Sequence, residues 1–487
     1  TILDDEKEFA RALISHERVD HVLHTGSRHA AKLFHSWRAE SRISSTTGGR
    51  NSVIVTASAH LETAVTGIVE SALEYAGQSP LAVSTVILVG NAGDSARFLG
   101  RLSDAIASIP IAAPGTSGAG MSSLARPATV QQRLLLETLD DSESWRVQPR
   151  QLDARGRLWS PGLRDNVSPD SRFRKGENRA PVVGIVRANT LEEAIDIQNA
   201  HRFGLSAGIY SFDDEEVGIW LDSAEAGLLS VNCSPGSAVR GRAPVQGWNR
   251  SVVGTVSSGG YETVLTLGRW QPVGFEPGTT VTLEGISEPV AQVIGAAQSG
   301  MDFTEFDWVR TGARSDEEAW GTAFATKALV HTESERIEHR YRPVPVTIRL
   351  SEGAPMVHLV RVLVAATRTQ SAIAISSALP LHSDLIALFR QWESPAGVAE
   401  VLVESDVRWR ARVQAGEIAT SRIRLIGGDR RILARVLHGQ LGIAVHASPV
   451  TASGRVELLP FLRGQTVCTG SENEGIPREN RPQPNTT

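Results

Sequence analysis

The chain has 487 residues, of which 41% are hydrophobic and 21% charged, and its formal net charge at pH 7 is -5. These values are typical of a globular protein with two or three domains, and the small negative charge gives no electrostatic reason to expect a nucleic acid or an anionic membrane as partner. No apolar run reaches the roughly 18 residues that a membrane-spanning helix needs, and residues 1–20 are charged rather than signal-like, so a cytoplasmic location without a membrane span is predicted.

Strands and helices alternate along the first 270 residues. A strand predicted at 19–24 ends at Thr25-Gly26-Ser27, and a helix follows through Phe34. The next elements, in chain order, are a strand at 51–55, a helical pattern from Leu61 to Ala72, a strand at 83–89, a helix at 93–109, a strand at 181–188, a helix at 190–202 and a strand at 204–212. This alternation predicts an α/β fold rather than an all-α or all-β fold.

The second half of the chain repeats the alternation after a less regular stretch. Residues 272–340 read as a connecting region with acidic helices that carry Trp. Strands are then predicted at 343–350, 371–377, 399–405, 421–426 and 441–447, with helices at 356–367, 384–392 and 430–438. This pattern predicts a second βα domain over 341–463, with the Gly-Gly-Asp of 427–429 in a strand-to-helix turn. The polar, Pro-rich residues 464–487 are predicted to be a disordered tail.

Five segments, in this order, resemble the aldehyde dehydrogenase superfamily. They are HTGSRHAAKLF (24–34), TTGGRNSVIVTASAHLETAV (46–65), AGQSPLA (76–82), APVVGIVRANTLEEAIDIQNAHRFGLSAGIYSFD (180–213) and APVQGWNRSVVG (243–254). Within the superfamily, the chain resembles the L-glutamate γ-semialdehyde (pyrroline-5-carboxylate) dehydrogenase part of bifunctional proline utilization A proteins. The segments HRYRPVPVTIRL (339–350) and GRVELLPFLRGQ (454–465) extend the resemblance to the C-terminal domain of those proteins.

The resemblance implies a domain order, a cofactor and a set of partners. The expected parts are a remnant of an NAD-binding, Rossmann-like domain (1–45), a catalytic domain (46–230), a substrate loop with a return segment (231–271), the connecting region (272–340) and the C-terminal domain (341–463). Family members carry an adenosine-binding lysine and an oxyanion Asn before the equivalent of residue 1, so the chain is expected to be the C-terminal part of a longer parent. NAD is the family's cofactor and an aldehyde its substrate; a proline dehydrogenase domain upstream and homo-oligomers are further expectations.

The two main catalytic positions of the family hold other residues here. Aldehyde oxidation of this type needs a thiolate to attack the carbonyl, donors for the oxyanion, and a base to activate water. The family's nucleophile is the Cys of a G-Q-x-C motif, where this chain has Pro80, which lacks both a thiol and a backbone N–H. The family's base is the Glu of an E-T-G-G motif, where Thr46 stands. A hydroxyl is no base near neutral pH, so no intact catalytic residue is predicted.

Other expected site residues come from the same resemblance. Gly26 and Ser27 match the turn that holds the cofactor's pyrophosphate, and Glu177 matches a Glu that contacts the nicotinamide ribose. Ser237 and Ala238 lie where backbone N–H groups would face the substrate carboxylate. Taken alone, Gly26-Ser27 is typical of an ordinary βα turn, and Glu177 is typical of a glutamate on the protein surface. The cysteines Cys233 and Cys468 show no metal-ligand spacing, so no metal site is predicted.

Three classes of function remain open on the sequence. A working dehydrogenase would need Ser79 or Cys233 to replace the missing thiol, although Ser79 has no visible base and a lone Cys is most often a packed side chain. The second class is a catalytically silent domain retained for binding, assembly or substrate channelling. The third is a truncated gene product.

Overall fold

The computed structural model describes residues 7–470 except 113–115, 117, 177–178, 237–241, 256–261, 269, 271–274, 277, 279–281, 333 and 393–396. The chain divides into two compact units, each assembled from segments that are distant in sequence. Unit 1 combines Thr1–Thr47, Val252–Thr326 and Arg340–Gly464, and unit 2 combines Gly48–Ser251, Lys327–His339 and Gln465–Thr487. The domain bounds inferred from the resemblance stay a prediction.

Unit 2 is organised around a large, mostly parallel sheet. Among the described residues, ten strands follow the order β13-β14-β20-β10-β9-β3-β4-β7-β6-β5. The parallel centre consists of β10 (Leu228–Val231), β9 (Ser206–Tyr210), β3 (Asn51–Val55), β4 (Val83–Val89) and β7 (Val182–Ala188). Every residue of β3 and β4 is buried, as expected for apolar strands that are covered on both faces.

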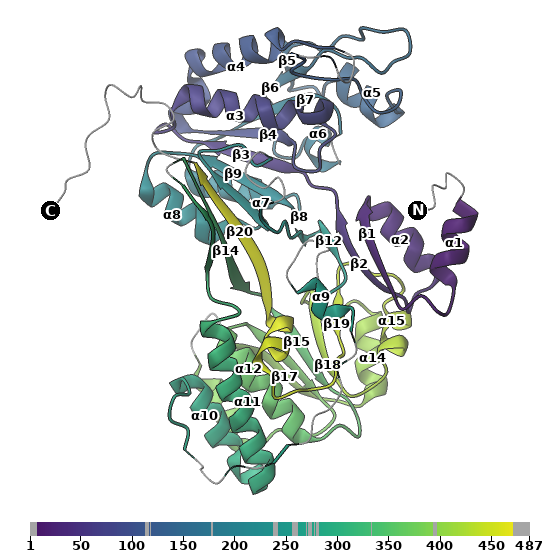
Figure 1. Cartoon of the computed structure of the whole chain (residues 1–487), viewed down its shortest axis with the longest axis vertical. Coiled ribbons are helices and arrows are strands. Elements are labelled where there is room, and N and C mark those ends of the chain that lie inside the picture. Colours follow the sequence, from purple (N-terminus) through teal and green to yellow (C-terminus); the bar gives the residue numbers. More distant parts are fainter. Residues whose placement is uncertain are drawn as a thin grey trace, which may run out of the picture. The chain divides into compact units, whose positions relative to one another are not determined.

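Helices cover both faces of this sheet. Figure 1 shows α3 (Leu61–Leu73) and α4 (Ala96–Ser108) on one face, with α7 (Leu191–Asn199) and α8 (Asp214–Ser223) on the other. The outer and shorter elements of unit 2 are α5 (Val130–Glu137), α6 (Arg172–Lys175), β5 (Ser144–Val147), β6 (Gly162–Asp165), β8 (Phe203–Gly204), β11 (Trp248–Asn249) and β13 (Lys327–His331). This arrangement confirms the alternation of strands and helices predicted for the first half of the chain.

The strand β20 (Leu462–Gly470) corrects one prediction. Residues 464–470 were expected to start a disordered tail, and that part of the prediction is wrong. They pair in parallel with β10, so that Ser230 lies opposite Cys468, and the side chains of Val467 and Cys468 are buried. Pairing with a strand more than 230 residues earlier therefore orders a segment whose own composition is largely polar. The other neighbour of β20 in the sheet is β14 (Glu335–Pro343). Residues 471–487 lie outside the described residues.

Unit 1 contains the second βα domain. Its main sheet, over the residues described there, has five parallel strands in the order β17-β16-β15-β18-β19. These are β17 (Val398–Val403), β16 (Ile373–Ser377), β15 (Val346–Leu350), β18 (Arg422–Ile426) and β19 (Ala444–His446). The helices are α10 (Glu288–Ala297), α11 (Phe303–Gly321), α12 (Met356–Thr369), α13 (Ser383–Gln391), α14 (Asp406–Gln414), α15 (Arg430–Val436) and α16 (Gly454–Glu457). A second parallel domain was predicted, and the structure confirms it.

The predicted Gly-Gly-Asp turn connects β18 to α15. Gly427 and Gly428 have φ angles of 69° and 72°, in the left-handed region that glycine adopts without strain. Asp429 then accepts a hydrogen bond from the N–H of Arg431 at 2.7 Å and caps the helix. The turn predicted at 427–429 is therefore confirmed.

A smaller sheet at the start of unit 1 carries part of the expected site. Within the described chain it has three strands, β1 (His21–Gly26), β2 (Arg42–Thr47) and β12 (Val252–Val253), with β2 in the centre. β1 and β2 are parallel and are joined by α2 (Arg28–Trp37). The helices α1 (Lys7–Ser15) and α9 (Thr263–Thr266) also belong to this unit.

Candidate functional site

Gly26, Ser27 and Thr46 meet at the carboxyl edge of the small sheet. In the parallel pair, Thr25 lies opposite Thr46 and Gly26 opposite Thr47, so the end of β2 is beside the turn that opens α2. The Ser27 hydroxyl is the N-cap of that ten-residue helix and accepts a hydrogen bond from the N–H of Ala30 at 3.1 Å. The structure thus brings the expected pyrophosphate turn next to the position of the expected base.

A histidine that the sequence analysis did not select lies against this turn. His24 Nδ1 is 2.7 Å from the Ser45 hydroxyl, and partial burial lowers the pKa of His24 below its usual value. A Cβ atom on Gly26 would lie 2.5 Å from His24 Nε2, so a larger residue at position 26 would displace the imidazole from where it lies. His24 and Gly26 are two residues apart on a strand, and this period places their side-chain directions on one face. That spacing was the signal available in the sequence.

Pro80 lies in the loop that precedes β4 in unit 2. After α3 ends at Leu73, Tyr75, Ala76 and Gly77 adopt φ angles of 49°, 56° and 69°. A Cβ on Gly77 would lie 2.3 Å from the carbonyl oxygen of Ala180, which explains glycine at this position. The Pro80 side chain is exposed, and the hydroxyl of Ser79 accepts a hydrogen bond from the N–H of Leu81 at 3.3 Å. Ser79 therefore serves as a turn residue here.

Asn51 ties this loop to the sheet. Its side-chain amide donates to the carbonyl oxygens of Pro80 at 2.8 Å and of Ala82 at 3.0 Å. Its Oδ1 accepts from the N–H of Ser206 at 3.1 Å, and the residue is buried. Asn51 was not among the predicted site residues. Its only signal in the sequence is that it is a polar residue between a Gly-Gly pair and an apolar strand. Two of its three hydrogen bonds therefore hold the backbone at Pro80, the expected nucleophile position.

Buried cations surround the segment that leads to Glu177. Arg50 donates to the carbonyl oxygens of Phe173 and Gly176, and Arg174 donates to those of Pro169 and Ile197. Burial lowers the pKa of Arg50 to about 9, with smaller contributions from the like charges of Arg174 and Arg164. The Nη1 and Nη2 atoms of Arg50 thus donate to carbonyl oxygens rather than to carboxylates. Glu177 itself lies outside the described residues, so its expected ribose contact stays a prediction.

Cys233 follows β10 in unit 2 and lies beside the second cysteine. The two Sγ atoms are 3.4 Å apart, and Tyr210 Oη donates to the carbonyl oxygen of Cys233 at 3.3 Å. The hydrogen bond with Cys233 and burial raise the pKa of the Cys468 thiol. Within the described chain, the Cys233 thiol makes its hydrogen bonds to Cys468 rather than to a histidine or a carboxylate. Ser237 and Ala238 of the expected substrate loop lie outside the described residues.

The expected catalytic positions are divided between the units. Thr46 belongs to unit 1 and Pro80 to unit 2, so the hypothesis that they face one cleft stays a prediction. In the part of the chain that the structure describes, no group of three or more His, Cys, Asp or Glu side chains could hold a metal ion. The described helices likewise include none that is long and apolar enough to cross a membrane.

The family is established by comparison. Residues 1–267 match the aldehyde dehydrogenase family, and the chain belongs to it. Malonate-semialdehyde dehydrogenase 1 of Geobacillus kaustophilus is 31% identical over 268 residues, which are 53% of this chain and 53% of that protein. Malonate-semialdehyde dehydrogenase of Bacillus subtilis is 25% identical over 262 residues, again 53% of each chain. This chain therefore spans about half the length of these curated relatives.

One solved structure extends the likeness to almost the whole chain. Proline utilization A from Corynebacterium freiburgense matches with a TM-score of 0.77 and 32% sequence identity, over 96% of this chain and 43% of that one. The match includes the second βα domain as well as the residues of the family match. The predicted fold class, an aldehyde-dehydrogenase-like α/β domain with a partial Rossmann-like domain and a second βα domain, is confirmed.

Proposed function

We propose that this chain is a catalytically silent relative of the L-glutamate γ-semialdehyde dehydrogenases of proline catabolism. The observation that carries the proposal is Pro80 at the family's nucleophile position, in a loop that Asn51 holds in place. Proline offers neither a sulfur to attack an aldehyde nor a backbone N–H to stabilise the oxyanion. A single residue therefore removes two requirements of the reaction.

The expected base position supports the same conclusion. Thr46, the next-to-last residue of β2, carries a hydroxyl, whose pKa lies far above neutrality in ordinary peptides, so it cannot accept a proton from the hydrolytic water. Cys233, the other thiol near the expected substrate loop, is hydrogen-bonded to Cys468. Neither candidate nucleophile, Ser79 or Cys233, thus has a hydrogen bond to a histidine or a carboxylate in the part of the chain that the structure describes.

The turn at Gly26 and Ser27 fits the pyrophosphate of a dinucleotide. It opens a ten-residue helix, whose first N–H groups favour an anion, and Gly26 is a position that a Cβ atom would fill. NAD bound at such a turn supplies the hydride acceptor for aldehyde oxidation in the family. In this chain Gly26 and Ser27 would hold the pyrophosphate of NAD. Cofactor binding is therefore proposed independently of aldehyde oxidation.

A second candidate function is a role in binding, assembly or substrate channelling. It is favoured by the likeness to a proline utilization A protein over 96% of the chain, which includes the C-terminal domain. A proline dehydrogenase domain would be the partner upstream, and a homo-oligomer the assembly. In this alternative the fold is retained because it presents surfaces rather than because it performs oxidation.

Activity and binding are measured separately. The purified chain is incubated with NAD and glutamate γ-semialdehyde, and NADH formation is followed by absorbance; we expect no turnover. Calorimetry with NAD then tests the turn at Gly26. NADH formation that is abolished in Cys233→Ala would contradict the proposal and identify Cys233 as the nucleophile. NADH formation abolished in Ser79→Ala would contradict it in favour of Ser79.

A further inference from the structure

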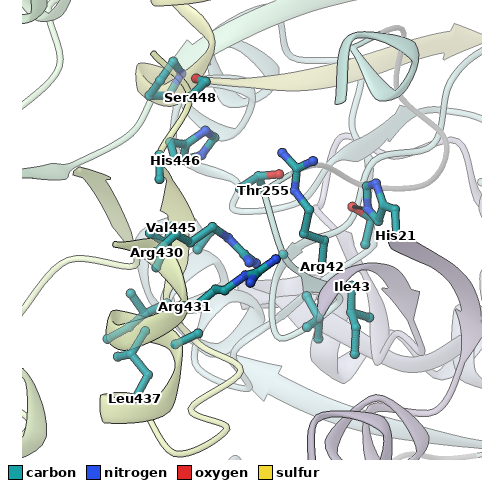
Figure 2. Close-up of a pocket in the computed structure, with 18 of the residues that line it drawn as sticks. His21, Arg42, Ile43, Thr255, Arg430, Arg431, Leu437, Val445, His446 and Ser448 are labelled. Atoms are coloured by element: carbon teal, nitrogen blue, oxygen red, sulfur yellow. Dashed lines mark hydrogen bonds between the residues drawn. The ribbon is translucent and has the colours of Figure 1, made fainter. Parts of the chain in front are cut away.

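A pocket in unit 1 belongs to neither the Gly26 turn nor the Pro80 loop. Its cavity is about 460 Å³, within the range of small-molecule sites. One wall comes from the amino ends of β1 and β2, with His21 and Arg42, and the other from α15, the edge strand β19 and the loops on either side of β19. Figure 2 shows Arg430, Arg431 and His446 on that second wall.

Three guanidinium groups gather in this pocket. Figure 2 shows Arg430 and Arg431 extending from α15 toward the strand that carries Arg42. Arg430 Nη1 donates to the carbonyl oxygen of Glu40 at 3.1 Å. Over the described residues, the side chains of Arg42 and Arg431 make no hydrogen bond or ion pair with the protein. The cationic groups are therefore placed together, and within the described residues none of the three forms an ion pair with a carboxylate.

The electrostatics favour an anion in the cavity. Burial, followed by the like charges of Arg42 and Arg431, lowers the pKa of Arg430 to about 10. Two acidic residues, Asp20 and Asp429, also line the pocket, and the Asp429 carboxylate already caps α15 by accepting from the Arg431 N–H. A bound anion would relieve the repulsion among the three cations, which is the same interaction that lowers the pKa of Arg430.

Two further features define the ligand. His446 Nε2 is buried and, within the described chain, has no hydrogen-bond partner, so a ligand atom could satisfy it. Burial lowers the pKa of His446, so its imidazole is neutral at pH 7 and can donate or accept one hydrogen bond. Apolar side chains lie on both walls, with Ile43 beside Arg42 and with Leu437 and Val445 on the wall that carries Arg430, Arg431 and His446. The pocket thus combines cationic and apolar side chains.

We propose that this pocket binds a small organic phosphate. The phosphate oxygens would contact Arg42, Arg430 and Arg431, because planar guanidinium groups bind phosphate through paired N–H donors. The organic part would lie against Ile43, Leu437 and Val445. A phosphate monoester carries a charge of about -1.5 to -2 near neutral pH, which suits three cations better than a single carboxylate does.

Calorimetric titrations of the whole chain with three probes test the proposal. The probes are phenyl phosphate, inorganic phosphate and benzoate. We expect phenyl phosphate to bind most tightly, inorganic phosphate more weakly because it lacks the apolar part, and benzoate most weakly because it carries one charge. Benzoate binding as tightly as phenyl phosphate would overturn the assignment to phosphates. Inorganic phosphate binding as tightly as phenyl phosphate would overturn the role of the apolar side chains.

Variants locate the binding site. Arg430→Gln and Arg42→Gln are each expected to weaken phenyl phosphate about tenfold, the typical loss for one charge-assisted contact. The matched control is Arg435→Gln, because Arg435 lies on the same helix with its side chain 64% exposed and outside the pocket lining; it should change affinity less than about twofold. If a glutamine variant fails to fold, Arg430→Lys keeps the charge and should still weaken binding severalfold.

An equal loss in Arg435→Gln, or no loss in the Arg42 and Arg430 variants, would show that phosphate binds elsewhere and would overturn the proposal. Absence of binding of phenyl phosphate to the unmodified chain would also overturn it. The readout is binding alone, so the result does not depend on whether the chain oxidises aldehydes.

Discussion

At the scale of single residues, His201 links the stability of unit 2 to pH. Its Nδ1 accepts a hydrogen bond from the N–H of Phe203 at 3.3 Å, and burial, then Arg174 and Arg50, lowers its pKa to about 3. In the unfolded chain a histidine binds a proton below about pH 6.5, whereas folded His201 stays neutral down to about pH 3. The unfolded state therefore binds more protons between these values, and the free energy of unfolding falls as pH falls.

We expect the unmodified chain to lose about 1 to 2 kcal/mol more than His201→Asn between pH 6.5 and 5, since one proton contributes up to about 1.4 kcal/mol per pH unit. Asparagine keeps an acceptor for the Phe203 N–H but does not titrate. Urea unfolding at both pH values measures the difference. His331→Asn, at an exposed histidine of the same unit, is the control and should behave like the unmodified chain. Identical pH dependence in His201→Asn would contradict the assignment.

The two thiols give a second prediction at this scale. The Sγ atoms of Cys233 and Cys468 are 3.4 Å apart and need to approach to about 2.05 Å to form a bond. Treatment with diamide should oxidise both thiols to one intrachain disulfide while diamide is reduced to the hydrazine. Mass spectrometry of a non-reducing digest should recover the 233–468 cross-linked peptide, and Cys468→Ser should abolish it. Recovery of both residues as free thiols after oxidation would show that the sulfurs do not meet.

At the scale of elements, a glycine allows α11 and α12 to share a buried ion pair. Arg361 on α12 donates through Nη1 and Nη2 to the two carboxylate oxygens of Asp316 on α11, both at 2.7 Å, and both side chains are fully buried. Gly312 lies one turn before Asp316 on α11. A Cβ at Gly312 would lie 2.3 Å from Arg361 Nε, so any larger residue displaces the guanidinium.

We expect Gly312→Ala to lower the free energy of unfolding by about 3 kcal/mol, because an uncompensated buried charge typically costs about 3 to 5 kcal/mol. Gly295→Ala on α10 is the matched control. No atom lies within 4 Å of its added Cβ, so alanine's helix propensity should raise stability by about 0.5 to 1 kcal/mol. Chemical unfolding of both variants measures the difference. Equal effects at the two glycines would rule out the steric argument.

At the scale of the whole molecule, restoring two side chains should not restore catalysis. The expected base position, Thr46, and the expected nucleophile position, Pro80, come from different units, and the chain spans about half the length of its curated relatives. We expect Thr46→Glu combined with Pro80→Cys to form no NADH from glutamate γ-semialdehyde, since two side chains do not by themselves supply the oriented oxyanion donors and the bound cofactor that the reaction needs. The positive control is the same double variant joined to the N-terminal half of the Geobacillus relative, for which NADH formation is expected. Turnover by the double variant alone would refute this prediction.

Local patterns in the sequence predicted much of the fold. The alternation of apolar strands with helices predicted both βα regions, and Gly-Gly-Asp predicted the turn before α15, because side-chain periodicity and glycine conformations are local properties. The order of five family motifs predicted the family. The same motifs identified Pro80 and Thr46 as departures from it, since residue identity needs no coordinates.

Only the tertiary structure decided which distant residues meet. Strand β20 escaped prediction because its partner β10 lies more than 230 residues earlier, and no local pattern encodes that pairing. The contact between Cys233 and Cys468 and the gathering of Arg42 with Arg430 have the same origin. Burial and charge repulsion depend on which atoms surround a group after folding. The sequence by itself therefore determined the family and the residues that stand at positions 46 and 80, whereas folding alone created the cationic pocket.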